Sequence, residues 1–282
     1  MRAVLLDVFT DTRFTGNQLA VFLDGSQVPE SLRQEVARAI GFSETVFVDP
    51  PSHPTAGDCR IRIFTPEVEL PFAGHPVLGT AVAVGLDRGL GGGAVVTLEC
   101  NVGPVPVELD ESGTGGWMRQ PLPTVEPWDD VDGVLGALGI DAGRLAAPVD
   151  VYTNGPSHLV VAVDDVSLVT AAAPDLGRLA KVAGTTGTSL CCVTGPGAVR
   201  TRMFVPGAGV AEDPATGSAA GPVGVHLLRH GLVEAGALLT LTQGVEIKRP
   251  STLLVRVEGL PDAIAAVGVG GSAVVVGELT YH

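Results

Sequence analysis

The hydrophobic positions of this chain fall into short alternating or β-branched runs and two longer runs that are almost wholly apolar. The short runs predict strands at residues 4–8, 20–23, 44–48, 60–64, 95–98, 105–109 and 273–280. Residues 31–40 have helical spacing, with Ser31 as the expected N-cap and Gly41 as the end. Residues 76–86 and 218–228 are apolar on nearly every face and run into Arg and Gly, so we expect two buried helices.

The pattern also repeats along the chain. Residues 7–10 (Asp-Val-Phe-Thr) recur at 150–153 as Asp-Val-Tyr-Thr, and residues 62–66 (Arg-Ile-Phe-Thr-Pro) recur at 202–206 as Arg-Met-Phe-Val-Pro. The displacement is close to half of the 282 residues. We therefore predict an α+β protein of two similar domains from an internal duplication, each a mixed or antiparallel sheet wrapped around a buried central helix.

The expected domain limits follow from the repeat. Residues 1–118 form the N-terminal domain and residues 134–272 the C-terminal domain. Residues 119–133 lie in a stretch rich in Gly, Pro and Asp, which is typical of a linker. The last strand, within residues 273–282, is expected to return to the first domain. Two copies of one domain would leave a cleft between them, the kind of place where small molecules bind.

Composition narrows the function classes. The net charge of −14 disfavours binding to nucleic acid or to anionic membranes. The chain shows neither a signal peptide nor an apolar run of membrane-spanning length, so we expect a soluble cytoplasmic protein. The four cysteines and six histidines lack metal-ligand spacing. His226 and His230 are four residues apart, but they lack the glutamate of an HExxH motif, so no metal is expected.

Two matched turns precede the buried helices. They are Phe72-Ala73-Gly74-His75 and Ala215-Thr216-Gly217-Ser218. The first N–H groups of a helix lack internal acceptors and lie at the positive end of its dipole, so two such starts could hold a carboxylate. Ordinary helix capping explains either turn alone, whereas its recurrence at one register favours binding.

Three ionisable side chains occur in one copy only. They are Glu44, His75 and Asp213, whose counterparts are Leu190, Ser218 and Leu70. Glu44 heads a strand and is expected to be half-buried, which would raise its pKa and suit it to proton transfer. Each also has a structural interpretation: a solvated strand-end Glu, an ordinary structural His, or an Asp that favours the helix dipole.

These residues carry a family resemblance that spans nearly the whole chain in order. The matching stretches are residues 14–17, 42–47, 62–66, 69–76 and 213–219. They resemble the phenazine-biosynthesis protein F (PhzF-like) family, which implies a diaminopimelate-epimerase-like fold and a homodimer. The resemblance also implies a cofactor-free isomerase whose type reaction is isomerisation of trans-2,3-dihydro-3-hydroxyanthranilate.

The resemblance implies roles for particular residues. Glu44 would move the proton, and His75 and Asp213 would assist. The residues implied to bind substrate are Asn17, Ser43, Gly74, Thr216, Gly217 and Ser218, with backbone at the two helix starts holding the substrate carboxylate.

The chain departs from the family at two points. Gln18 replaces the usual proline after Gly-Asn, so the floor of the pocket is expected to differ. Related racemases carry a thiol at each helix start, where this chain has His75 and Ser218, which disfavours two-cysteine racemisation. The substrate stays open, and so does a non-catalytic binding protein on the same fold. A hydrolase using Ser218 or Cys192 lacks a supporting motif.

Overall fold

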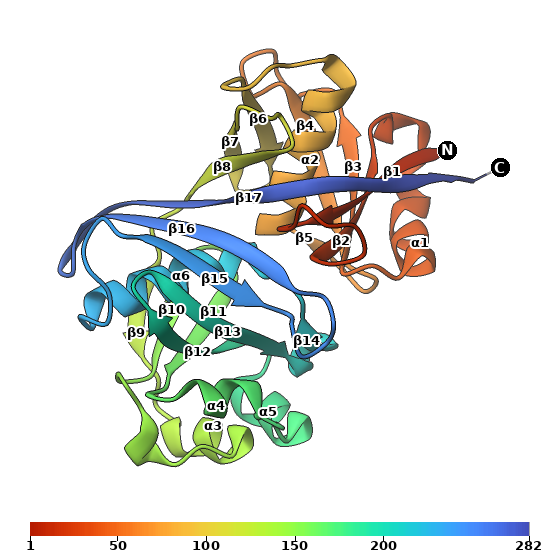
Figure 1. The fold of residues 1–282 in the computed structure, drawn as a ribbon. Coiled ribbons are helices and arrows are strands. Elements are labelled where there is room, and N and C mark those ends of the chain that lie inside the picture. Colours follow the sequence, from red (N-terminus) through yellow and green to blue (C-terminus); the bar gives the residue numbers. More distant parts are fainter. Residues whose placement is uncertain (282) are drawn as a thin grey trace. The chain divides into compact units, whose positions relative to one another are not determined.

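The computed structural model describes residues 1–281, a mixed α/β protein made of two units (Figure 1). Unit 1 comprises Met1–Arg119 and the residues from Gly270 onward, and unit 2 comprises Gln120–Val269. The strands of unit 1 are β1 (Arg2–Val8), β2 (Asn17–Phe22), β3 (Glu44–Asp49), β4 (Cys59–Phe64), β5 (Glu69–Leu70), β6 (Val95–Cys100), β7 (Gly103–Leu109) and β8 (Gly115–Gln120, whose last residue falls in unit 2). Its helices are the short η1 (Gly25–Gln27), α1 (Glu30–Ile40) and α2 (Gly74–Arg88).

Unit 2 contains more helices. Its strands are β9 (Thr124–Pro127), β10 (Asp150–Thr153), β11 (Ser157–Ala162), β12 (Gly187–Gly195), β13 (Ala198–Val205), β14 (Val210–Asp213), β15 (Leu238–Gln243) and β16 (Ser251–Leu260). Its helices are α3 (Val131–Leu138), η2 (Ala142–Arg144), α4 (Val166–Thr170), α5 (Leu176–Ala183), η3 (Pro206–Ala208) and α6 (Gly217–Arg229). The long strand β17 (Ala263–Thr280) begins in unit 2 and continues into unit 1, where it pairs antiparallel with β1.

The strands form where apolar and polar residues alternate along the sequence. In β7, Val105, Val107 and Leu109 are buried while the residues between them are exposed, so one face of the strand packs on the core. The two apolar runs are the helices α2 and α6, and each is buried along nearly its whole length. Helix α2 packs against β1, β2, β3, β6 and β7, and α6 packs against β10, β11, β12 and β16.

The strands pair in the same order in both units. In unit 1, β1 is antiparallel to β2, β2 is parallel to β3, and β4 pairs antiparallel with β3 and β5 but parallel with β6. In unit 2, β10 to β15 repeat these relationships one for one. An arginine–glutamate ion pair also recurs, Arg62 with Glu69 and Arg202 with Glu212, both at 2.7 Å.

One sequence expectation needs correction. Helix α1 begins at Glu30 with Pro29 in the N-cap position, so Ser31 lies inside the first turn and is not the cap. The boundary between the two units falls at Arg119 and Gln120, within the segment expected as a linker, and residues 119–133 also contain the end of β8, all of β9 and the start of α3. Strand β9 is held by backbone pairing with β10, and Asp130 caps α3 by accepting a hydrogen bond from Gly133 N. Such interactions leave no hydrophobic period in the sequence.

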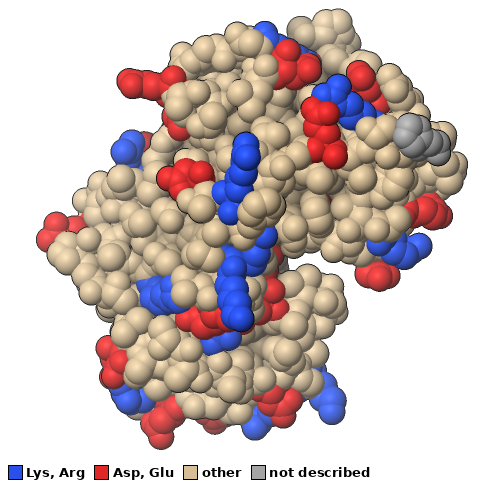
Figure 2. Space-filling view, turned by 45° about the vertical axis from the view of Figure 1, so that its right-hand side comes forward, with Lys and Arg blue, Asp and Glu red and all other residues tan. Residues whose placement is uncertain are grey.

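Charged groups are sparse on the surface. Figure 2 shows a face formed largely by uncharged residues, with acidic and basic side chains interspersed in small groups. Among residues 1–281, no helix is long and apolar enough to cross a membrane.

Close packing of α2 requires glycine at one position. A Cβ at Gly79 would lie 2.6 Å from both Leu19 Cδ2 and Val8 Cγ2. We expect Gly79→Ala to lower the free energy of unfolding, since overpacking costs about 1–3 kcal/mol and exceeds the helix-propensity gain of about 1 kcal/mol. Gly177→Ala in α5 is the matched control, because its Cβ would meet only Asp175 Oδ1 at 3.5 Å. Urea unfolding should show the first variant destabilised and the second stabilised; equal effects would contradict this packing.

The buried His158 makes stability depend on pH. Burial lowers the pKa of His158 from 6.5 to about 4. Below pH 6.5 the unfolded chain binds a proton at this site that the folded chain does not bind until about pH 4. Stability should therefore fall with decreasing pH in this window, by up to about 1.4 kcal/mol per pH unit. Its two ring nitrogens lack hydrogen-bond partners within the described residues, so His158→Leu should remove this contribution.

The measurement is the free energy of unfolding at several values between pH 4.5 and 7. His158→Leu should flatten the dependence, whereas His53→Leu, at an exposed loop position, should leave it unchanged. A slope identical in wild type and His158→Leu would contradict the assignment.

Candidate active site

One group of the expected site residues gathers in unit 1, at the starts of three elements. Asn17 begins β2 and Glu44 begins β3, and these parallel strands pair with Leu19 opposite Glu44. Their first residues therefore lie at the same edge of the sheet. His75 is the second residue of α2, directly after Gly74, and α2 packs on both strands. Strand register and helix packing thus bring together side chains that are far apart in the sequence.

A chain of hydrogen bonds orients His75. The Ser43 hydroxyl donates to Asn17 Oδ1 at 3.1 Å, which leaves the amide nitrogen of Asn17 facing His75 Nδ1 at 3.2 Å. Because an amide NH₂ can only donate, Nδ1 must be the accepting nitrogen of the ring. The network therefore assigns the neutral imidazole proton to Nε2.

The protonated Nε2 of His75 faces two acceptors. It lies 3.3 Å from the Gln18 carbonyl oxygen and 3.3 Å from Glu44 Oε2. Burial lowers the pKa of His75 from 6.5 to about 3, against the smaller raising effect of the Gln18 carbonyl. The ring is therefore neutral at pH 7. Its Nε2–H donates to the Gln18 carbonyl, and Glu44 Oε2 lies 3.3 Å from the same nitrogen as a close contact with an uncharged ring rather than an ion pair. The Glu44 side chain is 14% exposed, which agrees with the half-buried position expected from the sequence.

A second group gathers in unit 2 at the start of α6. Asp213 ends β14, and its Oδ2 accepts a hydrogen bond from the Thr216 hydroxyl at 2.5 Å. Gln243, the last residue of β15, donates to the Asp213 carbonyl at 2.8 Å and to Thr216 Oγ1 at 3.1 Å. The Thr216 hydroxyl is thereby engaged by Asp213 and Gln243.

The start of α6 is also held by side chains that the sequence did not single out. Gln120 donates to the Gly217 carbonyl at 2.7 Å, and Asn154 donates to the Ser218 carbonyl at 2.9 Å. Gln243, Gln120 and Asn154 carry no motif, because they act by reaching the helix start from other strands and loops. The N-cap residues of α2 and α6, Ala73 and Thr216, make no side-chain capping hydrogen bond. The first N–H groups of both helices suit an anionic ligand.

The expected site residues therefore form two sets. Asn17, Ser43, Glu44, Gly74 and His75 lie together in unit 1, and Asp213, Thr216, Gly217 and Ser218 lie together in unit 2. The binding of one substrate by both sets stays a prediction. Thiol chemistry is disfavoured in unit 2, where burial raises the pKa of Cys192 and raises that of Cys191 to about 12.

Comparison with known proteins identifies the family to which this chain is similar. Residues 6–278 match the phenazine biosynthesis-like protein family, PhzC-PhzF. A trans-2,3-dihydro-3-hydroxyanthranilate isomerase of Pseudomonas chlororaphis is 40% identical over 285 residues, which cover 98% of each chain. Among solved structures, a predicted epimerase from Pseudomonas aeruginosa is 33% identical with a TM-score of 0.84, covering 99% of this chain and 98% of its own. A PhzF-family protein of Bacillus anthracis is 26% identical with a TM-score of 0.86 and the same coverage.

Fold and relatives together define the class of protein, an isomerase with the mixed α/β fold shared by PhzF proteins and epimerases. The chain belongs to the phenazine biosynthesis-like (PhzC-PhzF) protein family.

The tautomer of His75 can be measured directly. Long-range ¹H–¹⁵N NMR on the wild-type protein should show a neutral ring protonated at Nε2 from pH 5 to 8. Asn17→Asp has nearly the same shape but cannot donate to Nδ1, so the proton should move to Nδ1 or a second proton should bind. Asn101→Asp, at an exposed position, should leave the spectrum of His75 unchanged. A wild-type ring protonated at Nδ1 would contradict the network.

Proposed function

We propose that this isomerase moves a proton within a small carboxylate-bearing biosynthetic intermediate, by the same type of reaction as trans-2,3-dihydro-3-hydroxyanthranilate isomerase. The observation that carries the proposal is the placement of Glu44 Oε2 3.3 Å from the Nε2 of a buried, neutral histidine. The relatives that carry this activity in their names, at 39–40% identity over 98% of this chain, support the reaction type.

Glu44 is assigned as the general base and acid. It takes a proton from an activated C–H of the substrate and returns it to another carbon on the same face. Protonating His75 at neutral pH is costly because its pKa is about 3, so the imidazole does not compete for the proton. His75 instead places its neutral ring against the carboxylate, with Nε2 3.3 Å from Glu44 Oε2, and so restricts the orientation of the carboxylate. Asn17 and Ser43 then act by setting the tautomer of His75, in addition to the substrate contact implied by the resemblance.

The unit 2 set is assigned to substrate binding. Asp213, oriented by the Thr216 hydroxyl, suits an amino or hydroxyl group of the substrate. The uncapped starts of α2 and α6 suit its carboxylate. The reaction needs only a base and a bound carboxylate, so we propose that it proceeds without metal, flavin or pyridoxal phosphate.

We also propose that the two units arose by duplication of one domain. The support is the matching order of strand pairing and the recurring pairs Arg62–Glu69 and Arg202–Glu212. The differences between the copies then mark the catalytic residues, since Glu44 and His75 belong to one unit and Asp213 to the other. The homodimer and the cytoplasmic location stay predictions.

The test compares wild type with Glu44→Gln on trans-2,3-dihydro-3-hydroxyanthranilate in D₂O, followed by proton NMR. Wild type should convert the substrate, and the variant should lose at least about 10²- to 10⁴-fold in kcat, the usual contribution of general acid–base catalysis. Glu67→Gln, at an exposed position, is the matched control and should keep wild-type activity.

The outcomes separate the alternatives. Turnover by Glu44→Gln at the wild-type rate would overturn the assignment of the base. Failure of folded wild type to convert this substrate would direct the search to other amino-acid-derived carboxylates. Tight binding without exchange of any substrate proton with solvent would favour a binding protein on the same fold.

A further inference from the structure

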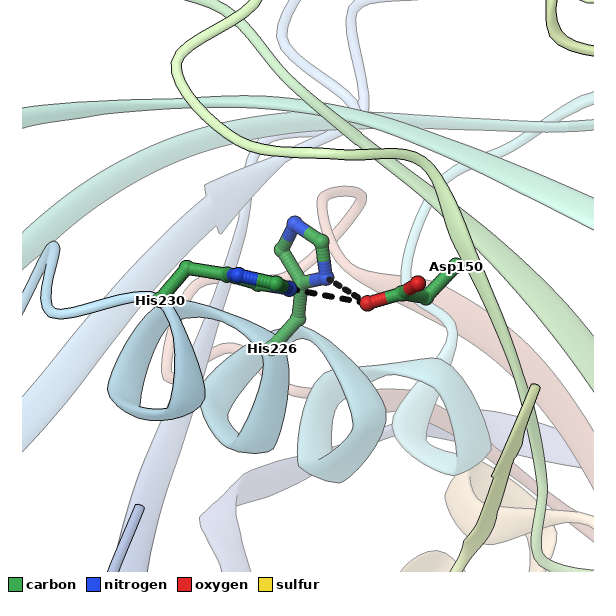
Figure 3. A group of neighbouring side chains, drawn as sticks. All are labelled: Asp150, His226 and His230. Atoms are coloured by element: carbon green, nitrogen blue, oxygen red, sulfur yellow. Dashed lines mark hydrogen bonds and ion pairs between the residues drawn. The ribbon is translucent and has the colours of Figure 1, made fainter. Parts of the chain in front are cut away.

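A second cluster of ionisable side chains lies in unit 2, at the far end of α6. His226 and His230 are one helical turn apart, and Asp150 faces them from β10 (Figure 3). Asp150 Oδ2 lies 2.8 Å from His230 Nε2 and 3.7 Å from His226 Nδ1. Ser218, at the start of α6, is eight residues from His226, or about 12 Å along a helix axis. The cluster is therefore separate from the Asp213 set.

The three donor atoms are spaced as metal ligands require. They all lie within 4.8 Å of one another. An ion bound at about 2.0–2.2 Å in tetrahedral geometry holds its ligand atoms roughly 3.3–3.5 Å apart. This value falls between the 2.8 Å from Asp150 Oδ2 to His230 Nε2 and the 3.7 Å from Asp150 Oδ2 to His226 Nδ1. The Tyr152 hydroxyl is 3.1 Å from His226 Nδ1 and 3.4 Å from Asp150 Oδ2. That oxygen, or a water molecule, would fill the fourth position.

The ligand atom of His226 would be Nδ1, the ring nitrogen that faces Asp150 Oδ2 and the Tyr152 hydroxyl. The residue is fully buried, so packing fixes the position of this nitrogen. The neighbouring His230 side chain is 23% exposed, which leaves a route for an ion from solvent. Arg229 adds a positive charge near His226 and Tyr152, and Asp150 provides the negative charge that offsets it.

We propose that Asp150, His226 and His230 bind one divalent transition-metal ion of the zinc type. Imidazole and carboxylate ligands in this number suit Zn²⁺, Co²⁺ or Ni²⁺ better than Mg²⁺ or Ca²⁺. The ion joins β10 to the end of α6, so its role is structural and independent of the proton transfer proposed for Glu44. This proposal departs from the expectation of no metal drawn from the sequence, in which Asp150, 80 positions from His230, did not stand out as a third ligand.

The test is titration of the metal-free full-length protein with Co²⁺, followed by visible absorption. One equivalent should bind with the intense bands of tetrahedral Co²⁺, and Zn²⁺ should displace it. Zn²⁺ at about 100 times its dissociation constant should raise Tm by roughly 5–10 °C. Metal analysis by mass spectrometry after dialysis against Zn²⁺ should give one ion per chain.

Variants distinguish this site from adventitious binding. In His230→Gln the new amide can still donate a hydrogen bond to Asp150, and the side chain at this position is partly exposed, so the variant should fold. It should nevertheless lose at least about tenfold in Co²⁺ affinity. Asp150→Asn should lose the bands as well, while His53→Gln, at an exposed histidine of unit 1, should bind like wild type. Absence of stoichiometric binding by wild type, or unchanged binding by His230→Gln, would overturn the proposal. Isomerase activity of metal-free wild type is expected to persist, so the two proposals fail separately.

Discussion

Burial of α2 is the constraint on which the unit 1 site depends. The helix is enclosed by β1, β2, β3, β6 and β7, so its second residue, His75, is removed from water. Loss of hydration disfavours the imidazolium ion and holds the pKa of His75 near 3. A neutral ring needs a defined tautomer, and the amide of Asn17 provides it. In the proposed reaction, the same burial that stabilises the fold leaves Glu44 as the group that carries the proton.

The two ends of α6 illustrate how one buried helix can serve separate purposes. At its start, Gln120, Asn154 and Gln243 bind backbone or hydroxyl groups and fix the loop that carries Asp213. At its end, His226 and His230 meet Asp150 from β10. A helix buried along its length must satisfy polar groups at both termini with partners from other elements. In both proposals, the side chains gathered at the ends of α6 are the ones that bind a ligand.

Buried histidines also link function to stability. Burial lowers the pKa values of His75, His158 and His226, so the folded chain resists protonation that the unfolded chain accepts. Each contributes stability that is present above pH 6.5 and is lost as the pH falls toward its folded pKa. Keeping His75 neutral, as the proposed reaction requires, therefore carries a stability cost in acid.

Sequence patterns were enough to predict the strands of alternating pattern, the two apolar helices and the family. These features are local: a period of two, an apolar run or a contiguous motif records which residues face the core. The sequence also singled out Glu44, His75 and Asp213, because each breaks the repeat. The sequence mistook Ser31 for a cap. It also did not predict the strand and helix start within residues 119–133, because backbone pairing and a local cap leave no hydrophobic period.

Contacts between side chains that are far apart in the sequence could not be predicted and come from the folded structure. The tautomer of His75 depends on Asn17 and Ser43, which reach it through parallel pairing of β2 with β3 and packing of α2. Nothing in their sequence neighbourhood distinguishes Gln243 and Gln120 from ordinary strand residues. Asp150 opens a repeated stretch, but no sequence signal connects it with His226 and His230. Hydrogen bonds and ligand spheres act over about 3 Å in space, whereas a sequence pattern records only separation along the chain.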